Sequence, residues 1–246
     1  MRRKDKESIH SFPRKPAVAG FSSFQPKHPH TDQGETMQRI LDRTQSDWVA
    51  AIVAAVALFA IALITLNAPV EATLGTGIRS VYVHVGFTWA GMAGLYLAGA
   101  MGVGVALWPK VALVRWMRAV GIVGLGFFAA GTAVSLYAQQ VNWGSISWVE
   151  PITVSMLRFT AVGIIVHILL SWPIGDRIKG GLSLALAAFH VWSVDNTALV
   201  LHPADPIGTS TSTGIRDTFS AIFVVSLVMA AWLVFYLYNR LLQSPA

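Results

Sequence analysis

The chain has 246 residues, of which 54% are hydrophobic and only 12% are charged, and its formal net charge is +6. A soluble domain carries about a quarter charged residues, and here the apolar excess lies in long runs that are nearly free of charge, which is typical of membrane spans. The chain has no cysteine, which excludes disulfides, thiolate metal sites and thioether attachment of a cofactor.

The first 47 residues precede any apolar run, and we expect them to form a cytoplasmic tail. Residues 1–36 mix Lys, Arg, His, Pro and Ser without periodicity, which indicates disorder. The alternative is that translation begins at Met37 and that this stretch is not made. No apolar run in the tail has the character of a signal peptide.

Six later segments are long enough to cross a membrane, because a span needs about 20 apolar residues for a hydrocarbon core of about 30 Å. The sequence therefore predicts an all-α integral membrane protein, a bundle of six transmembrane helices over residues 48–240 with a short tail at 241–246. The segments are Trp48–Leu66, Val83–Leu107, Ala119–Tyr137, Val154–Trp172, Leu182–Leu201 and Thr218–Tyr238. The second and third are rich in glycine, so we expect these two to pack closely inside the bundle.

The basic residues predict the orientation. The tail before the first span is rich in Lys and Arg, and the second and fourth connections carry Lys110, Arg115, Arg118, Arg177 and Lys179. The opposite side has Arg79, Arg158 and Arg216. The excess of positive charge on cytoplasmic loops places both termini in the cytoplasm. The charge is thereby explained by membrane orientation, and we expect lipid contact and no nucleic acid partner.

Two histidines and a tryptophan-bearing loop are expected at the outer surface. His84 begins the second span, His202 follows the fifth, and the third connection, residues 138–153, contains Trp143 and Trp148. Two imidazoles beside aromatic rings can hold a planar apolar ligand and coordinate its iron. The simpler reading is that the tryptophans anchor the chain at the lipid headgroups and that each histidine is an ordinary surface residue.

The residues around these positions resemble a known family over about residues 78–207. Tyr82-Val83-His84-Val85 followed by Trp89 and Met92 resembles the family segment Met-Tyr-Val-His-Val-Pro-x-x-Trp-x-x-Met. Trp143-Gly144, Trp148 and Glu150-Pro151 resemble its tryptophan-rich WWD stretch, and Asn196-Thr197 with Leu201-His202 resembles its segment Asn-Thr-Leu-His-Gln. The family is the heme exporter protein C, or cytochrome c maturation protein C, family.

The resemblance implies a role in handling heme at a bacterial cytoplasmic membrane. His84 and His202 would be the axial ligands of a non-covalent heme b on the outer face, above a loop formed by Trp143, Gly144, Trp148 and Glu150. The partners would be a periplasmic heme chaperone and the subunits of an ATP-binding cassette transporter. The chain would present a ligand and would not be an enzyme.

The chain departs from the family pattern in ways that keep a second reading open. Glu150 stands where the family has Asp, Gly86 stands where it has Pro, and the loop holds fewer tryptophans. A structural membrane subunit without heme is therefore an alternative.

Three further residues are candidates within the spans. His167 and His190 are expected at similar depth on adjacent antiparallel helices, where they could hold a permanent b-type heme in a membrane electron carrier. The simpler reading is that each makes a hydrogen bond inside the bundle. Arg158 is expected near the outer end of the fourth span, where it could pair with a heme propionate or extend to lipid phosphate.

Overall fold

The computed structural model describes residues 46–201 and 207–243. The chain divides into two units, residues 1–39 and 40–246, and the following description concerns the second. His202 and the tail before residue 46 lie outside the described residues.

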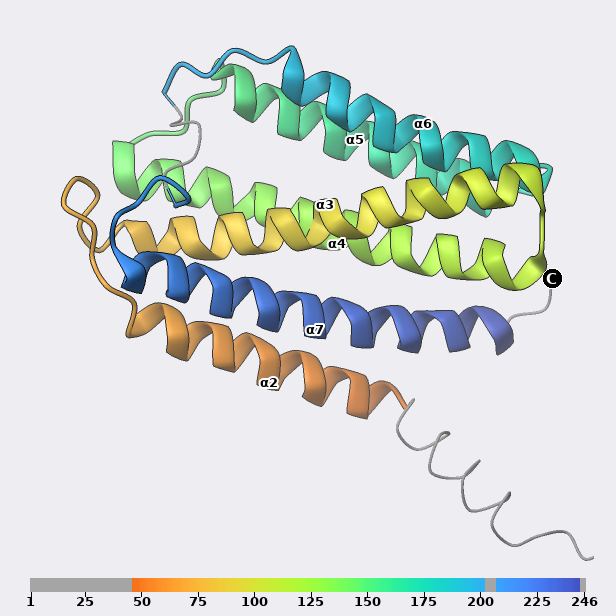
Figure 1. Cartoon of the computed structure of the whole chain (residues 1–246), viewed down its shortest axis with the longest axis horizontal. Helices are drawn as coiled ribbons and strands as arrows, with labels where there is room; N and C mark the ends of the chain where they lie inside the picture. Colours follow the sequence, from red (N-terminus) through yellow and green to blue (C-terminus); the bar gives the residue numbers. More distant parts are fainter. Residues whose placement is uncertain (1–45, 202–206, 244–246) are drawn as a thin grey trace, which may run out of the picture. The chain divides into compact units, whose positions relative to one another are not determined.

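The described residues form helices and no β-strand, in agreement with the predicted all-α class (Figure 1). The helices are α2 (Asp47–Leu66), α3 (Ile78–Leu107), α4 (Val111–Trp143), α5 (Pro151–Ser171), α6 (Asp176–Asp195) and α7 (Thr213–Gln243). Within the described ranges, all but α6 are long and apolar enough to cross a membrane. The chain thus has the helices of a multi-pass membrane protein.

Helix α6 differs from the span expected at Leu182–Leu201. It begins at Asp176 and ends at Asp195, so that both ends lie six residues before those of the expected span. Asp176 lies in the first turn, where a negative charge favours the helix dipole, and the Asn196 amide donates to the Trp192 carbonyl at 2.9 Å beyond the last turn. With 20 residues, α6 is about 30 Å long, but its first turn carries Asp176, Arg177 and Lys179.

Side-chain hydrogen bonds define one end of the bundle, which we call the His84 end. The Asn142 amide at the end of α4 donates to the Gly77 carbonyl at the start of α3, at 3.3 Å. The Ser155 and Ser193 hydroxyls join the start of α5 to the end of α6 at 2.6 Å. Helix α7 also starts at this end (Figure 1), so α6 returns the chain from the far end of α5 to the side where α7 begins.

Glycines bring α3 and α4 into backbone contact. A Cβ added at Gly91 would overlap the Phe128 backbone nitrogen, and one at Gly124 would lie 2.8 Å from the Leu95 nitrogen. Contacts this close need residues without side chains. The prediction that the two glycine-rich spans pack together inside the bundle is confirmed.

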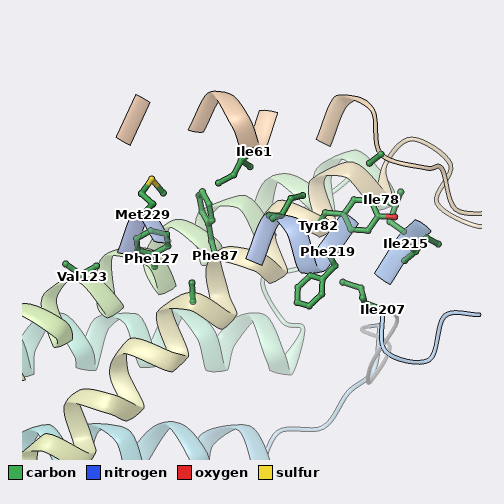
Figure 2. Packing of buried hydrophobic residues seen from close by; sticks show 13 residues of the cluster. Ile61, Ile78, Tyr82, Phe87, Val123, Phe127, Ile207, Ile215, Phe219 and Met229 are labelled. Carbon is green, nitrogen blue, oxygen red and sulfur yellow. The ribbon is translucent and has the colours of Figure 1, made fainter. Parts of the chain in front are cut away.

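The main apolar core joins α2, α3, α4 and α7 near the His84 end, and Figure 2 shows its side chains meeting between these helices. Tyr82 and Ile222 are fully buried in it. Ile207, from the segment that precedes α7, packs into the same cluster. This core therefore fixes the segment after residue 206 against the start of α3.

Candidate functional site

His84 is the best-defined candidate ligand. It lies in the second turn of α3 with 6% of its surface exposed. Its Nδ1 lies 2.9 Å from the Gly131 carbonyl oxygen, which can only accept, so Nδ1–H is the donor. This tautomer leaves the lone pair on Nε2, as a histidine that coordinates a metal requires.

His84 lines a cavity of about 440 Å³, which we call the bundle cavity. Its walls come from α3 to α7 and are mostly apolar. Besides His84 and His190, the lining includes Thr88, Met92, Phe128, Met156, Phe219 and Arg216. Ligand sites in proteins are about 300–1,000 Å³ with a few polar groups in an apolar wall, and this cavity has that character.

His84 also lines a second cavity of about 590 Å³, which we call the loop cavity. Here the lining is more polar and includes Glu71, Gln139, Asn142, Trp143, Leu201 and Thr209. Ile207 lines both cavities as well. His84 and Ile207 thus lie between a space inside the helices and a space beneath the connecting segments.

The tryptophan-bearing loop is shorter than the sequence suggested. Instead of residues 138–153, only Gly144–Glu150 lies outside the helices, because α4 continues to Trp143 and α5 begins at Pro151. Gly144 ends α4 with a φ of +77°, which glycine adopts without strain. The Ser147 N–H donates to the Gln139 side-chain oxygen at 3.0 Å, which ties the loop back to α4.

Glu150 connects this loop to the segment before His202. Its side chain is 3% exposed, and its Oε1 accepts a hydrogen bond from the Leu201 N–H at 3.1 Å. A buried carboxylate needs such a partner. The contact holds Leu201, a residue of the loop cavity wall, beside the start of α5.

The expected site residues are only partly brought together. His84 and Trp143 share the loop cavity, whereas Trp148 is 61% exposed and lines neither cavity. Gly144, Glu150 and Arg158 are also absent from both linings, and Arg158 is exposed on α5.

His167 and His190 lie at different depths, and the expectation of similar depth is wrong. His167 contacts α4 at Gly121, whereas the ring of His190 packs against Phe128. Seven residues of helix separate these contacts, which is about 10 Å. The expectation failed because it counted from Leu182, whereas α6 begins at Asp176 and His190 lies near the His84 end. One iron cannot be coordinated by both side chains.

His190 instead belongs to the floor of the bundle cavity. Its Nδ1 is 2.6 Å from the Tyr96 hydroxyl, and its ring packs edge-on against Phe159 at 4.5 Å between centroids. The sequence analysis named His190 as a candidate, but paired it with His167 and not with His84. It treated Arg216 only as a charge on the outer side, although Arg216 lines the same cavity as His84 and His190.

Glu71 gives the loop cavity a negative charge. Its Oε2 accepts hydrogen bonds from the Leu74 and Thr73 N–H groups, both at 2.8 Å. The bond from Leu74 is the largest cause that lowers the pKa of Glu71 below its usual value. The carboxylate is therefore ionised at neutral pH.

No protein-family model matches the chain, and no curated protein matches it.

Proposed function

We propose that this chain binds heme b non-covalently at the outer face of a bacterial cytoplasmic membrane and presents it to a heme chaperone during cytochrome c maturation. It would act within a complex that contains ATP-binding cassette transporter subunits, and it would catalyse no reaction. The observation that carries the proposal is His84, a buried imidazole whose Nδ1–H is held by the Gly131 carbonyl and whose side chain lines two cavities.

The residues present are suited to heme. A planar apolar ring with an iron centre needs an apolar enclosure and an imidazole of fixed tautomer, and the bundle cavity offers both. Trp143 adds an aromatic side chain in the loop cavity. When bound, the heme supplies the iron that the imidazole coordinates, and the chain controls its ligation and its access to water.

His202 would be the second histidine that holds the heme iron, and the position of its neighbour supports this. His202 lies outside the described residues, but Leu201 lines the loop cavity and is held there by Glu150. Trp148 and Gly144 would act in the loop that covers the site, where the chaperone would approach. Trp148 is well exposed for such a contact.

The distribution of charge supports the outer placement. Lys110, Arg115, Arg177 and Lys179 lie at the end of the bundle opposite His84, and the bias of basic residues towards the cytoplasm favours an outer position for the His84 end. Both α5 and α7 begin at the His84 end, which supports a return of the chain across the membrane by α6. We infer six crossings with both termini in the cytoplasm.

The absorption spectrum of the detergent-purified chain tests the proposal. Wild type, His84→Ala, His202→Ala and His190→Ala are expressed in a heme-replete host and compared, with Trp108→Ala as a control: this exposed tryptophan lies between α3 and α4, at the end of the bundle opposite His84, and lines neither cavity. We expect a Soret band in wild type and in Trp108→Ala, and a shifted or lost band in His84→Ala and His202→Ala.

Each other result has a distinct meaning. A Soret band that is unchanged in both His84→Ala and His202→Ala would show that neither histidine binds the heme iron. A band lost in His84→Ala and His190→Ala, but kept in His202→Ala, would show that His202 is not a ligand and that the heme depends on the two histidines of the bundle cavity. Absence of heme from the wild type, while the transporter subunits still co-purify, leaves the structural-subunit alternative.

A further inference from the structure

The two cavities that share His84 carry opposite charges. Among the described residues that line the bundle cavity, Arg216 is the one with a permanent charge, and no carboxylate joins it. Among those that line the loop cavity, Glu71 is the charged residue, and no Lys or Arg joins it. A ligand that carries carboxylates and contacts His84 is therefore attracted towards the bundle cavity and repelled from the loop cavity.

The position of Arg216 favours an anionic ligand and gives the positive charge little role in stabilising the fold. It lies in the first turns of α7, near the positive end of the helix dipole, which disfavours a positive side chain. Within the described part of the chain, no side-chain hydrogen bond or ion pair joins its guanidinium to another residue. A guanidinium forms two parallel hydrogen bonds with a carboxylate, which makes it a suitable partner for a ligand acid group.

The rest of the bundle cavity fits an apolar body behind such an acid group. Arg216 is exposed and lies at the beginning of α7, so it stands at the mouth of the cavity. Met92, Phe128 and Met156 line the wall, and His190 is 3% exposed and lies deeper in the bundle. A cationic residue at the mouth and apolar residues deeper in the cavity suit an amphipathic acid, which has one charged edge and one apolar part.

We propose that Arg216 binds the propionate carboxylates of heme and thereby turns the acid edge of the ring towards the bundle cavity, away from Glu71. This inference rests on the proposed function, and it assigns to Arg216 the role that the sequence suggested for Arg158. The recognition element is the carboxylate, so heme should bind better than its dimethyl ester.

Titration of the purified full-length chain with heme and with heme dimethyl ester tests this, with Soret absorbance as the readout. The variants are Arg216→Gln, Arg216→Lys and the matched control Arg158→Gln, an exposed arginine that lines neither cavity. We expect Arg216→Gln to weaken heme binding about tenfold, as for loss of a charge-assisted hydrogen bond, and to leave ester binding unchanged. Arg216→Lys should restore part of the loss, and Arg158→Gln should bind both ligands as the wild type does.

Three results would overturn the inference. Equal affinity of wild type and Arg216→Gln for heme would show that Arg216 does not bind the carboxylates. Weaker heme binding in Arg158→Gln, and not in Arg216→Gln, would assign the propionates to Arg158 on α5. An equal loss of heme and ester binding in Arg216→Gln would indicate a structural effect only. If the wild type takes up neither ligand, the proposed function itself fails, which this titration separates from failure at Arg216.

Discussion

At the scale of single residues, buried polar side chains gather at the His84 end of the bundle. Most of the buried polar set lies within the last turns of α4, the first turns of α5 and the ends of α3 and α6 that meet them: His84, Thr132, Ser135, Gln139, Glu150, Thr153, Ser155 and Ser193. Several bond to one another, as in the 2.7 Å contact from the Gln139 amide to the Thr153 hydroxyl. Burying polar groups is costly unless they are paired, so these mutual hydrogen bonds offset the cost of burial at the His84 end.

Glu71 predicts a pH dependence at this end. Its pKa in the folded chain lies below the usual 4.5 because the Leu74 and Thr73 N–H groups bond to the ionised carboxylate. A lowered folded pKa gives a stabilisation that is fully present above the unfolded pKa and is lost as the pH falls through the folded pKa. We expect the difference in Tm between wild type and Glu71→Gln to be constant from pH 6 to 8, roughly, and to shrink in acid.

Thermal unfolding in detergent, measured for the two proteins side by side across this pH range, checks the expectation. A difference that stays the same in acid would mean that the Glu71 carboxylate does not hold the turn at residues 71–75. A difference in Tm that grows in acid would mean that folding raises the pKa of Glu71 instead of lowering it.

At the scale of helices, the sequence predicted which segments are helical better than where they end. The six apolar segments all lie largely within α2 to α7. The ends differ because polar residues can continue a helix as well as form a loop: α4 runs on to Trp143 through residues expected in a loop, and there the Asn142 amide donates to the Ala138 carbonyl at 2.8 Å. Hydropathy does not record such local bonds. The error at α6 also displaced His190 and hid its place in the site.

Only part of the candidate site could be predicted, because the sequence shows local patterns but not the packing of distant helices. His84 and Trp143 carry a recognisable pattern and lie close to their helix ends, so a local reading located them. Arg216 and His190 come together with His84 only through the packing of α3, α6 and α7. That packing depends on contacts far apart in the chain, such as Gly99 against Ala187, which spacing along one helix does not reveal.

The glycine contacts between α3 and α4 predict opposite effects for two alanine substitutions. Gly91→Ala places a methyl group against the Phe128 backbone, which cannot rotate away, so we expect a loss of about 1–3 kcal/mol from overpacking. Gly126→Ala, in the same helix pair, meets no atom within 4 Å and should raise stability by about 0.4–1 kcal/mol by reducing the freedom of the unfolded chain.

Unfolding of both variants in denaturant or by heat gives the comparison. Equal small gains at the two positions would show that α3 and α4 do not approach as closely as described. Gly126→Ala also serves as the control for the general effect of alanine on helix propensity.

At the scale of the whole molecule, the absence of cysteine allows the orientation to be tested with single introduced thiols. Ser145→Cys lies in the loop between α4 and α5, and Gly175→Cys lies at the other end, between α5 and α6. Both positions are exposed. In intact bacterial spheroplasts, a membrane-impermeant maleimide should label Ser145→Cys, and it should label Gly175→Cys only after the membrane is opened.

The reverse pattern would invert the bundle and place the His84 end in the cytoplasm. Labelling of both positions from outside would show that α5 does not cross the membrane. Either result would contradict the proposed presentation of heme to a periplasmic chaperone.

The close contact of α3 with α4 also determines which part of the wall around the two cavities can change its conformation. Backbone atoms that touch through glycine have no side chains to rearrange, so sliding these two helices creates clashes. On the other flank, α7 meets α3 through long side chains, with Trp89 packed edge-on against Phe219 and Phe223, and such rings can change rotamer. The pair α3–α4 therefore holds His84 in place, whereas the aromatic side chains that join α7 to α3 are the part of the wall that can rearrange around a large ligand.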